Sequence, residues 1–145
     1  MTYYKELSLY SYWNTQNEPY TQNVGWLESS EHFAQGTVPT EFSARLLNFC
    51  KGKVNLTRGI HFCNLCHDPD IAFQQASEKH FGSAEIRVFY NNKIYAAPDL
   101  IFHYVVDHQY LPPIEFIEAV LRGPLPRTAE SDRLIVRIEV DYIYR

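Results

Sequence analysis

The sequence predicts an α+β fold with a mainly antiparallel sheet, a helical hairpin and one further short helix. Three observations predict it: alternating apolar segments near both ends of the chain, a pair of such segments in the middle, and helical periodicity in between. Strands and helices that are grouped in this way are typical of α+β proteins. The length of 145 residues fits one domain, which we assign to residues 1–145.

The first predicted elements are a strand and a helix. Residues 3–13 alternate loosely, with Leu7 and Leu9 on one side and tyrosines on the other, and predict a strand, whereas the polar residues 14–23 predict a loop. Residues 39–52 begin at a proline, which a first helical turn tolerates, and end at a glycine. The predicted apolar stripe of this helix consists of Phe42, Leu46, Phe49 and Cys50.

The second half of the chain predicts a β-hairpin, an αα-hairpin and a final strand. Residues 84–97 form two short alternating runs joined by two asparagines, which tolerate the positive φ of a tight turn. Residues 98–108 and 114–124 predict two helices, and residues 133–145 alternate as expected for a long strand with one wet face. The predicted stripe of the second helix consists of Ile114, Ile117 and Leu121.

Composition excludes several function classes. A net charge of −4 without any cluster of Lys and Arg argues against nucleic acid as a partner. No signal-like N-terminus and no apolar window of bilayer length is present, so we expect a cytoplasmic protein that does not bind membranes. Three cysteines cannot pair completely, and a reducing compartment favours metal binding or free thiols.

The segment GIHFCNLCHDP, residues 59–69, carries the main chemical signal. Cys63 and Cys66 have the C-x-x-C spacing that lets two thiolates bind one tetrahedral ion. His61 lies two residues earlier, and in extended backbone it points to the same side as Cys63. These residues predict a zinc site. The competing interpretation is a pair of buried thiols beside a loop, while Cys50 is expected in the core.

A fourth ligand has to come from farther along the chain. His80 lies at a zinc-finger-like distance, and His103 and His108 lie on the first helix of the αα-hairpin. We favour His103 because Asp99 and Asp107 fall one turn to either side of it, where a carboxylate could orient its second ring nitrogen. His103 as a core histidine and His108 as a helix cap remain alternatives. The predicted metal ligands are His61, Cys63, Cys66 and His103.

Other cysteine chemistries fit the residues less well. A thioredoxin-like dithiol belongs at a strand-to-helix junction in a parallel sheet, whereas here Asp68 and Pro69 follow closely. A zinc deaminase needs a proline before its C-x-x-C, and Phe62 stands there. No glycine-rich phosphate loop or nucleophile elbow is present in the sequence.

Two longer motifs carry a resemblance to a family. Residues 59–66 read GIHFCNLC and residues 103–116 read HYVVDHQYLPPIEF. The chain resembles an uncharacterised family of small bacterial proteins with the pattern G-x-H-x-C-x-x-C followed by H-Y-x-x-x-H-x-Y-x-P-P-x-E-F, over about residues 24–120. The resemblance implies no established activity, and loosely suggests accessory or immunity-type roles. It implies one constellation of His61, Cys63, Cys66, His103 and His108.

The leading functional hypothesis is a zinc-binding accessory or interaction module whose partner is another protein. The first alternative is a zinc hydrolase in which three protein ligands leave one position for water, with Asp99, Asp107 or Glu115 as the general base. The second alternative is a metal-free, immunity-type domain that binds a protein through an acidic and tyrosine-rich surface.

Overall fold

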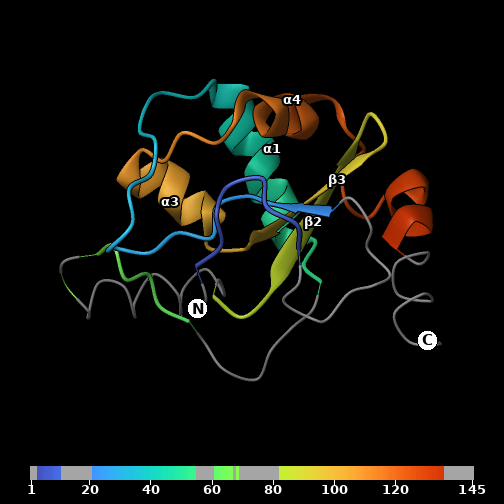
Figure 1. Ribbon diagram of the computed structural model, residues 1–145. Coiled ribbons are helices and arrows are strands. Elements are labelled where there is room, and N and C mark those ends of the chain that lie inside the picture. The colour runs from blue at the N-terminus through green and yellow to red at the C-terminus, as the bar shows by residue number, and fades with distance from the viewer. Residues whose placement is uncertain (1–2, 11–20, 55–60, 67, 69–81, 136–145) are drawn as a thin grey trace.

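The computed structural model describes residues 3–10, 21–54, 61–66, 68 and 82–135, and these confirm the α+β class (Figure 1). The described helices and strands are β1 (Thr21–Asn23), α1 (Thr40–Lys51), β2 (Glu85–Tyr90), β3 (Lys93–Pro98), α3 (Ile101–His108) and α4 (Ile114–Arg122). The three strands form one sheet in the order β1-β3-β2. The predicted short helix, β-hairpin and αα-hairpin are all present.

The sheet is mixed, with β3 at its centre. β2 and β3 pair antiparallel from Glu85 opposite Pro98 to Tyr90 opposite Lys93. The two asparagines between them have φ values of 54° and 62°, as the tight turn requires. β1 runs parallel to β3, from Thr21 opposite Ile94. The antiparallel ladder is the longer of the two.

Two predictions of local structure at the start of the chain are wrong. β1 lies inside residues 14–23, for which the polar composition predicted a loop. Its polar side chains Thr21 and Asn23 are fully buried, because β3 pairs with one edge and the segment around Leu9 bridges the other. Residues 3–10 are irregular apart from that bridge, and a φ of 61° at Leu7 interrupts the extended backbone. The remainder of that predicted strand lies outside the described residues.

The predicted C-terminal strand also differs from the structure where it is described. Residues 129–135 are helical, so the strand prediction is wrong for residues 133–135, and residues 136–145 lie outside the described part. The hydroxyl of Thr128 accepts a hydrogen bond from the Ser131 N–H at 3.3 Å. This contact caps the helix start and outweighs the alternating pattern locally.

The two faces of the sheet bury different chemistry. Ile86 and Val88 of β2 pack into the main core, and α1 and α4 both contact this strand (Figure 1). Glu85 and Arg87 lie on the opposite face. There Glu85 accepts hydrogen bonds of 2.8 Å from the Tyr10 hydroxyl and from the Arg87 guanidinium. The predicted stripe of α1 is confirmed, since the four residues named for it are its buried ones.

The apolar stripe of α4 agrees with the prediction in part, since Ile117 and Leu121 pack against the core as partly buried side chains. Its buried residues are Phe116, Ala119 and Val120, whereas the side chain of Ile114 is 83 % exposed. The Phe116 ring meets the rings of Phe42 and Tyr95 edge to face, at centroid distances of 6.3 and 5.9 Å. These aromatic contacts with α1 and β3 place Phe116 at the centre of the buried face.

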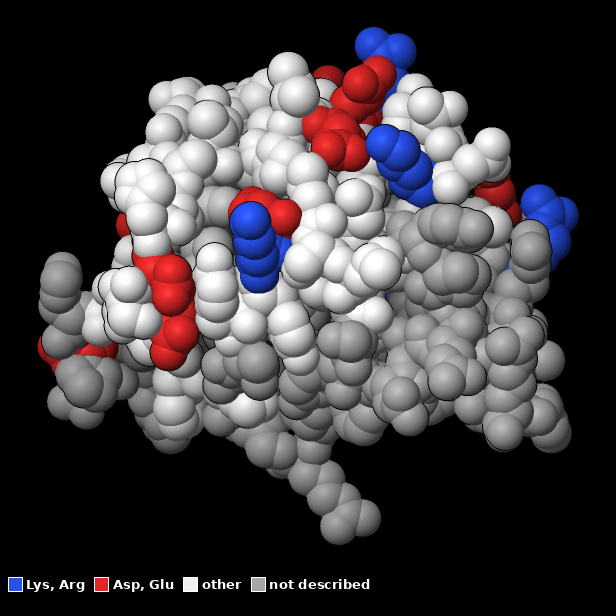
Figure 2. Space-filling view, in the orientation of Figure 1, with Lys and Arg blue, Asp and Glu red and all other residues white. Residues whose placement is uncertain are grey.

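The surface shows no dominant charge on the face in view. Figure 2 shows acidic and basic side chains on this face, and the basic ones among the described residues do not form a continuous stripe of the kind that a phosphate backbone requires. In the part of the chain that the structure describes, no helix combines the length and apolar character needed to cross a bilayer.

Candidate metal centre

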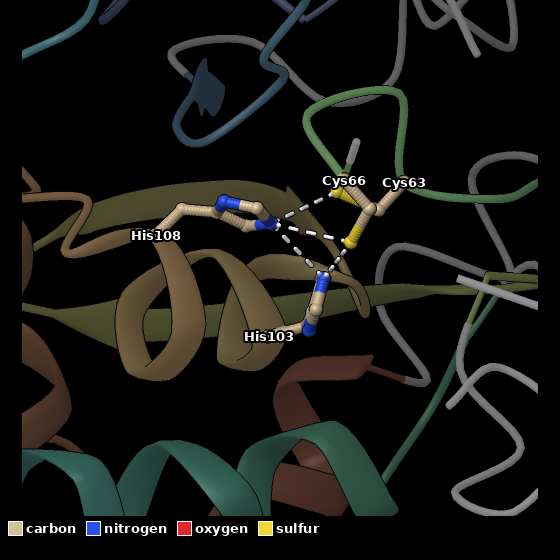
Figure 3. A group of neighbouring side chains, drawn as sticks. All are labelled: Cys63, Cys66, His103 and His108. Atoms are coloured by element: carbon tan, nitrogen blue, oxygen red, sulfur yellow. Dashed lines mark hydrogen bonds between the residues drawn. The ribbon is translucent and has the colours of Figure 1, made fainter. Parts of the chain in front are cut away.

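Four potential metal ligands from two separate segments converge on one point. Cys63 and Cys66 come from the cysteine loop, which we define as residues 61–66, and His103 and His108 come from α3 (Figure 3). One ligand atom from each residue lies within 4.8 Å of the other three. Within the described residues this is the only such group of His, Cys, Asp and Glu.

The distances between the ligand atoms are close to the edges of a zinc tetrahedron. With Zn–N of about 2.0–2.1 Å and Zn–S of about 2.3 Å, a regular tetrahedron has N–N edges of about 3.3–3.4 Å and N–S edges of about 3.5–3.6 Å. The two Nε2 atoms are 3.2 Å apart. The Cys66 Sγ lies 3.2 Å from His103 Nε2 and 3.5 Å from His108 Nε2, and the Cys63 Sγ lies 3.4 Å from His108 Nε2. These four edges lie within about 0.3 Å of the tetrahedral values, and the other two edges, Cys63–Cys66 and Cys63–His103, are at most 4.8 Å long.

Asp107 fixes the orientation of the His103 ring. Its Oδ2 lies 2.7 Å from Nδ1 of His103, one helical turn away. An ionised carboxylate only accepts hydrogen bonds, so we assign the proton of the neutral ring to Nδ1. The Nε2 atom, which then carries the lone pair, faces the Cys66 sulfur and the Nε2 atom of His108. This arrangement of carboxylate, imidazole and ligand space is the usual support of a metal-bound histidine, and Asp107 was one of the two carboxylates predicted for it.

His108 reaches the site from the C-terminal end of α3. It lies five residues after His103, which is not the spacing that places two side chains on one helix face. The helix ends at His108, and Gln109 adopts a left-handed conformation with φ 53°. The N–H of Tyr110 then donates to the Tyr104 carbonyl at 3.0 Å, which closes the helix end. The ring of His108 meets that of His103 edge to face, at 4.9 Å.

The cysteine loop presents one buried and one half-buried thiol. Burial raises the pKa of the Cys63 thiol to about 12, although the backbone N–H groups of Leu65 and Cys66 donate to its sulfur and lower the pKa in part. Cys63 is only 5 % exposed, whereas Cys66 is partly exposed. At neutral pH the Cys63 sulfur therefore keeps its proton until a cation replaces it.

The structure does not place His61 among the four converging residues. His61 belongs to the described residues, but His108 stands where the spacing argument had expected it. The backbone of His61 pairs with the chain after the loop, since its N–H donates to the Gly82 carbonyl at 2.7 Å. A side chain at Gly82 would collide with the His61 carbonyl oxygen, at 2.2 Å from a Cβ. His80, the third alternative, lies outside the described residues.

Two of the three carboxylates considered as general bases have partners elsewhere. Asp99 is fully buried, accepts the Gly82 N–H at 2.7 Å and pairs with Lys53 at 3.3 Å. Asp99 also precedes α3, which begins at Ile101, and none of its described contacts is with His103. Glu115 accepts the Tyr95 hydroxyl at 2.9 Å and contacts Lys93 at 3.4 Å. Only Asp107 touches a residue of the converging group.

Cys50 is a core residue, as expected. It is fully buried in α1, and burial, followed by the nearby charge of Asp99, raises the pKa of its thiol. The two tyrosines of the αα-hairpin, Tyr104 and Tyr110, are buried as well, and the Tyr110 hydroxyl donates to Glu6. Their role in the described structure is packing and anchoring.

Comparison with known proteins gives one match. A family model described as "Domain of unknown function (DUF7919)" matches residues 2–121, a stretch that contains both the cysteine loop and α3. Neither the curated proteins nor the solved structures yielded a match. The expected membership of an uncharacterised family is thereby confirmed, while the two-part motif and the bacterial source stay predictions.

Proposed function

This chain belongs to the DUF7919 family, and we propose that it is a zinc-binding accessory or interaction module whose ion is held by Cys63, Cys66, His103 and His108. The ion joins the cysteine loop to α3. When bound, zinc supplies a closed tetrahedral crosslink of the kind found in structural sites.

The convergence of two sulfurs and two imidazole nitrogens within 4.8 Å of one another, with four edges close to tetrahedral length, carries this proposal. Thiolate and imidazole together favour zinc over magnesium, calcium or manganese, which prefer oxygen ligands. The carboxylate of Asp107 is hydrogen-bonded to Nδ1 of His103, on the side of the ring away from the ligand atom Nε2. It therefore orients a ligand and is not itself a ligand in this proposal. The residues present therefore fit zinc.

A structural role is favoured over the zinc hydrolase. A hydrolytic zinc ion keeps one position for water, whereas four protein ligands fill a tetrahedral shell. A general base would also have to stand beside that water, and Asp107 already accepts a hydrogen bond from His103. No observation favours hydrolysis over a closed site.

The side chains around the site support an interaction role with another protein. Phe62, next to Cys63, is 45 % exposed, and Val106, between the two histidines of α3, is 47 % exposed. A continuous patch of exposed apolar side chains marks a site that contacts other proteins, and in this proposal these two side chains belong to one such patch. In this proposal the ion orders the loop that carries Phe62, in the reducing environment of the cytoplasm, and a protein partner contacts the ordered loop.

Metal analysis of the purified full chain tests the proposal. We expect one zinc ion per chain in the wild type and in the His61→Ala variant, and a loss of bound zinc in Cys63→Ser and His108→Ala. The two histidine variants form a matched pair, because both residues lie near the site and only His108 has its ring nitrogen in the group. Wild-type protein without zinc, or zinc loss in His61→Ala with retention in His108→Ala, would contradict the assignment.

A further inference from the structure

The cysteine loop brings two thiols together at the metal centre with unequal access to solvent. The Sγ atoms of Cys63 and Cys66 lie within 4.8 Å of each other. We propose that this pair is a modification site: a hydroperoxide such as hydrogen peroxide oxidises it to a disulfide, and the ion is released. The inference rests on the proposed zinc site and adds a second state of that site, in which the cysteines form a disulfide and no ion is bound.

Exposure decides which sulfur reacts first. Cys66 is partly exposed, while Cys63 is 5 % exposed, so a small oxidant reaches Cys66 more easily. Oxidation by peroxide follows thiolate character and access, and coordination keeps the Cys66 sulfur as a thiolate. Cys63 then acts as the resolving thiol. Cys50 is fully buried and lies outside the group, so it takes no part.

The reaction balances with peroxide as the only oxidant. The Cys66 thiolate attacks one peroxide oxygen; an S–O bond forms, the O–O bond breaks, and hydroxide leaves and takes up a proton. The Cys63 thiolate then attacks the sulfenic sulfur of Cys66; the S–S bond forms and a second hydroxide leaves and is protonated. Two thiolates lose two electrons, peroxide is reduced to two waters, and zinc departs without a change of oxidation state.

Because of the way the ligands are distributed, this oxidation would break the link between the cysteine loop and α3. Each segment contributes two ligands, so the disulfide removes all the ligands of the cysteine loop at once. His103 and His108 alone leave half of a tetrahedral shell empty, which cannot retain the ion against competition from solvent and other binders. Oxidation thus detaches the loop from α3, and reduction restores the dithiol for a new ion.

Peroxide titration of the zinc-loaded full chain tests the inference. Zinc content is measured first, then zinc release is followed with a chromogenic chelator while intact mass and peptide mapping follow the cysteines. We expect one zinc released per disulfide formed, a Cys63–Cys66 crosslink with the loss of two hydrogens, and rebinding of zinc after reduction by a dithiol. The Cys50→Ala variant should behave as the wild type, which makes it the matched control.

The outcomes separate the two proposals. A chain that contains no zinc before the titration contradicts the proposed function. A chain that contains zinc but forms no Cys63–Cys66 disulfide, releases zinc through sulfinic or sulfonic products, or crosslinks through Cys50 overturns the oxidation proposal alone. Because the crosslink is mapped in the wild type, the test does not depend on folded variants of Cys63 or Cys66.

Discussion

The two segments that form the candidate metal centre are held in place very differently. Ile101, Tyr104 and Val105 bury one side of α3 in the main core, and α3 also contacts α1. The cysteine loop packs Cys63 and Leu65 against that core and pairs one backbone N–H with Gly82. Core packing thus holds the helix that carries the histidines, whereas the described contacts that anchor the loop outside α3 include the packing of Cys63, Leu65 and Cys66 and that one hydrogen bond.

The comparison indicates what the ion would contribute. A ligand pair on a packed helix loses little conformational freedom when a cation binds, while a pair on a loop loses more. The free energy of binding is then used mainly to order the loop. Four experiments distinguish the contribution of core packing from that of the ion: removal of the metal, a substitution in the core, a substitution of Asp107 and a change of pH.

Removal of the metal should have the largest effect and should fall mainly on the loop. Structural zinc contributes on the order of 10 kcal/mol in small zinc-binding peptides, comparable to the net stability of about 5–15 kcal/mol of a whole domain. After chelation we expect a large drop in Tm and early loss of amide protection in residues 61–66, with protection of α3 retained. Hydrogen exchange read by mass spectrometry measures both. Equal loss of protection in α3 would contradict a preformed helix.

Weakening the core beneath α3 should destabilise the chain while zinc still binds. Ile101→Ala removes a fully buried side chain, and such changes cost about 2–5 kcal/mol. Val106→Ala on the same helix removes a side chain that is 47 % exposed and should change stability by about 0.5 kcal/mol or less. Denaturant unfolding compares the two variants. Similar losses in both, or loss of zinc from folded Ile101→Ala, would argue against this division of roles.

Removal of the carboxylate behind His103 should weaken zinc binding without unfolding the chain. Loss of such a supporting partner costs about 10–100-fold in metal affinity, so Asp107→Ala should lie in that range and Asp107→Asn, which keeps an acceptor, should lose less. Glu118→Gln on α4 is the control, because its carboxylate is about half exposed and pairs only weakly with Arg122 at 3.7 Å. Competition with a chelator of known affinity measures all three. Unchanged affinity in Asp107→Ala would show that the 2.7 Å contact does not orient the ligand.

Lowering the pH should weaken zinc binding gradually. The pKa of Cys63 is raised to about 12 by burial, so its thiol is protonated throughout the physiological range without metal. The ion must displace that proton, and the apparent zinc affinity should fall by about tenfold for each pH unit lowered, with any further proton release making it steeper. Raising the pH should tighten binding. Zinc titrations at several pH values provide the slope, and a pH-independent affinity would mean that the Cys63 proton is not displaced.

Local patterns predicted those parts of the fold that depend on neighbours along the chain. The stripe of α1 and the turn between β2 and β3 follow from helical spacing and from two adjacent asparagines. β1 was missed because a strand of three polar residues exists only through pairing with β3, more than 70 residues later. The stripe of α4 was predicted only in part: Ile117 and Leu121 pack against the core, but the aromatic contacts of Phe116 set the centre of the buried face and leave Ile114 exposed.

The sequence by itself determined that two thiols with C-x-x-C spacing stand in a loop and that two histidines and Asp107 stand on one helix. The tertiary structure decided which imidazoles meet the sulfurs, and it brought in His108 where spacing had favoured His61. The physical reason is that the sulfurs and the α3 imidazoles are 37 to 45 residues apart along the chain. Spacing constrains only neighbours within a turn or two, whereas burial of α3 against the core fixes where the end of that helix, and with it His108, comes to lie.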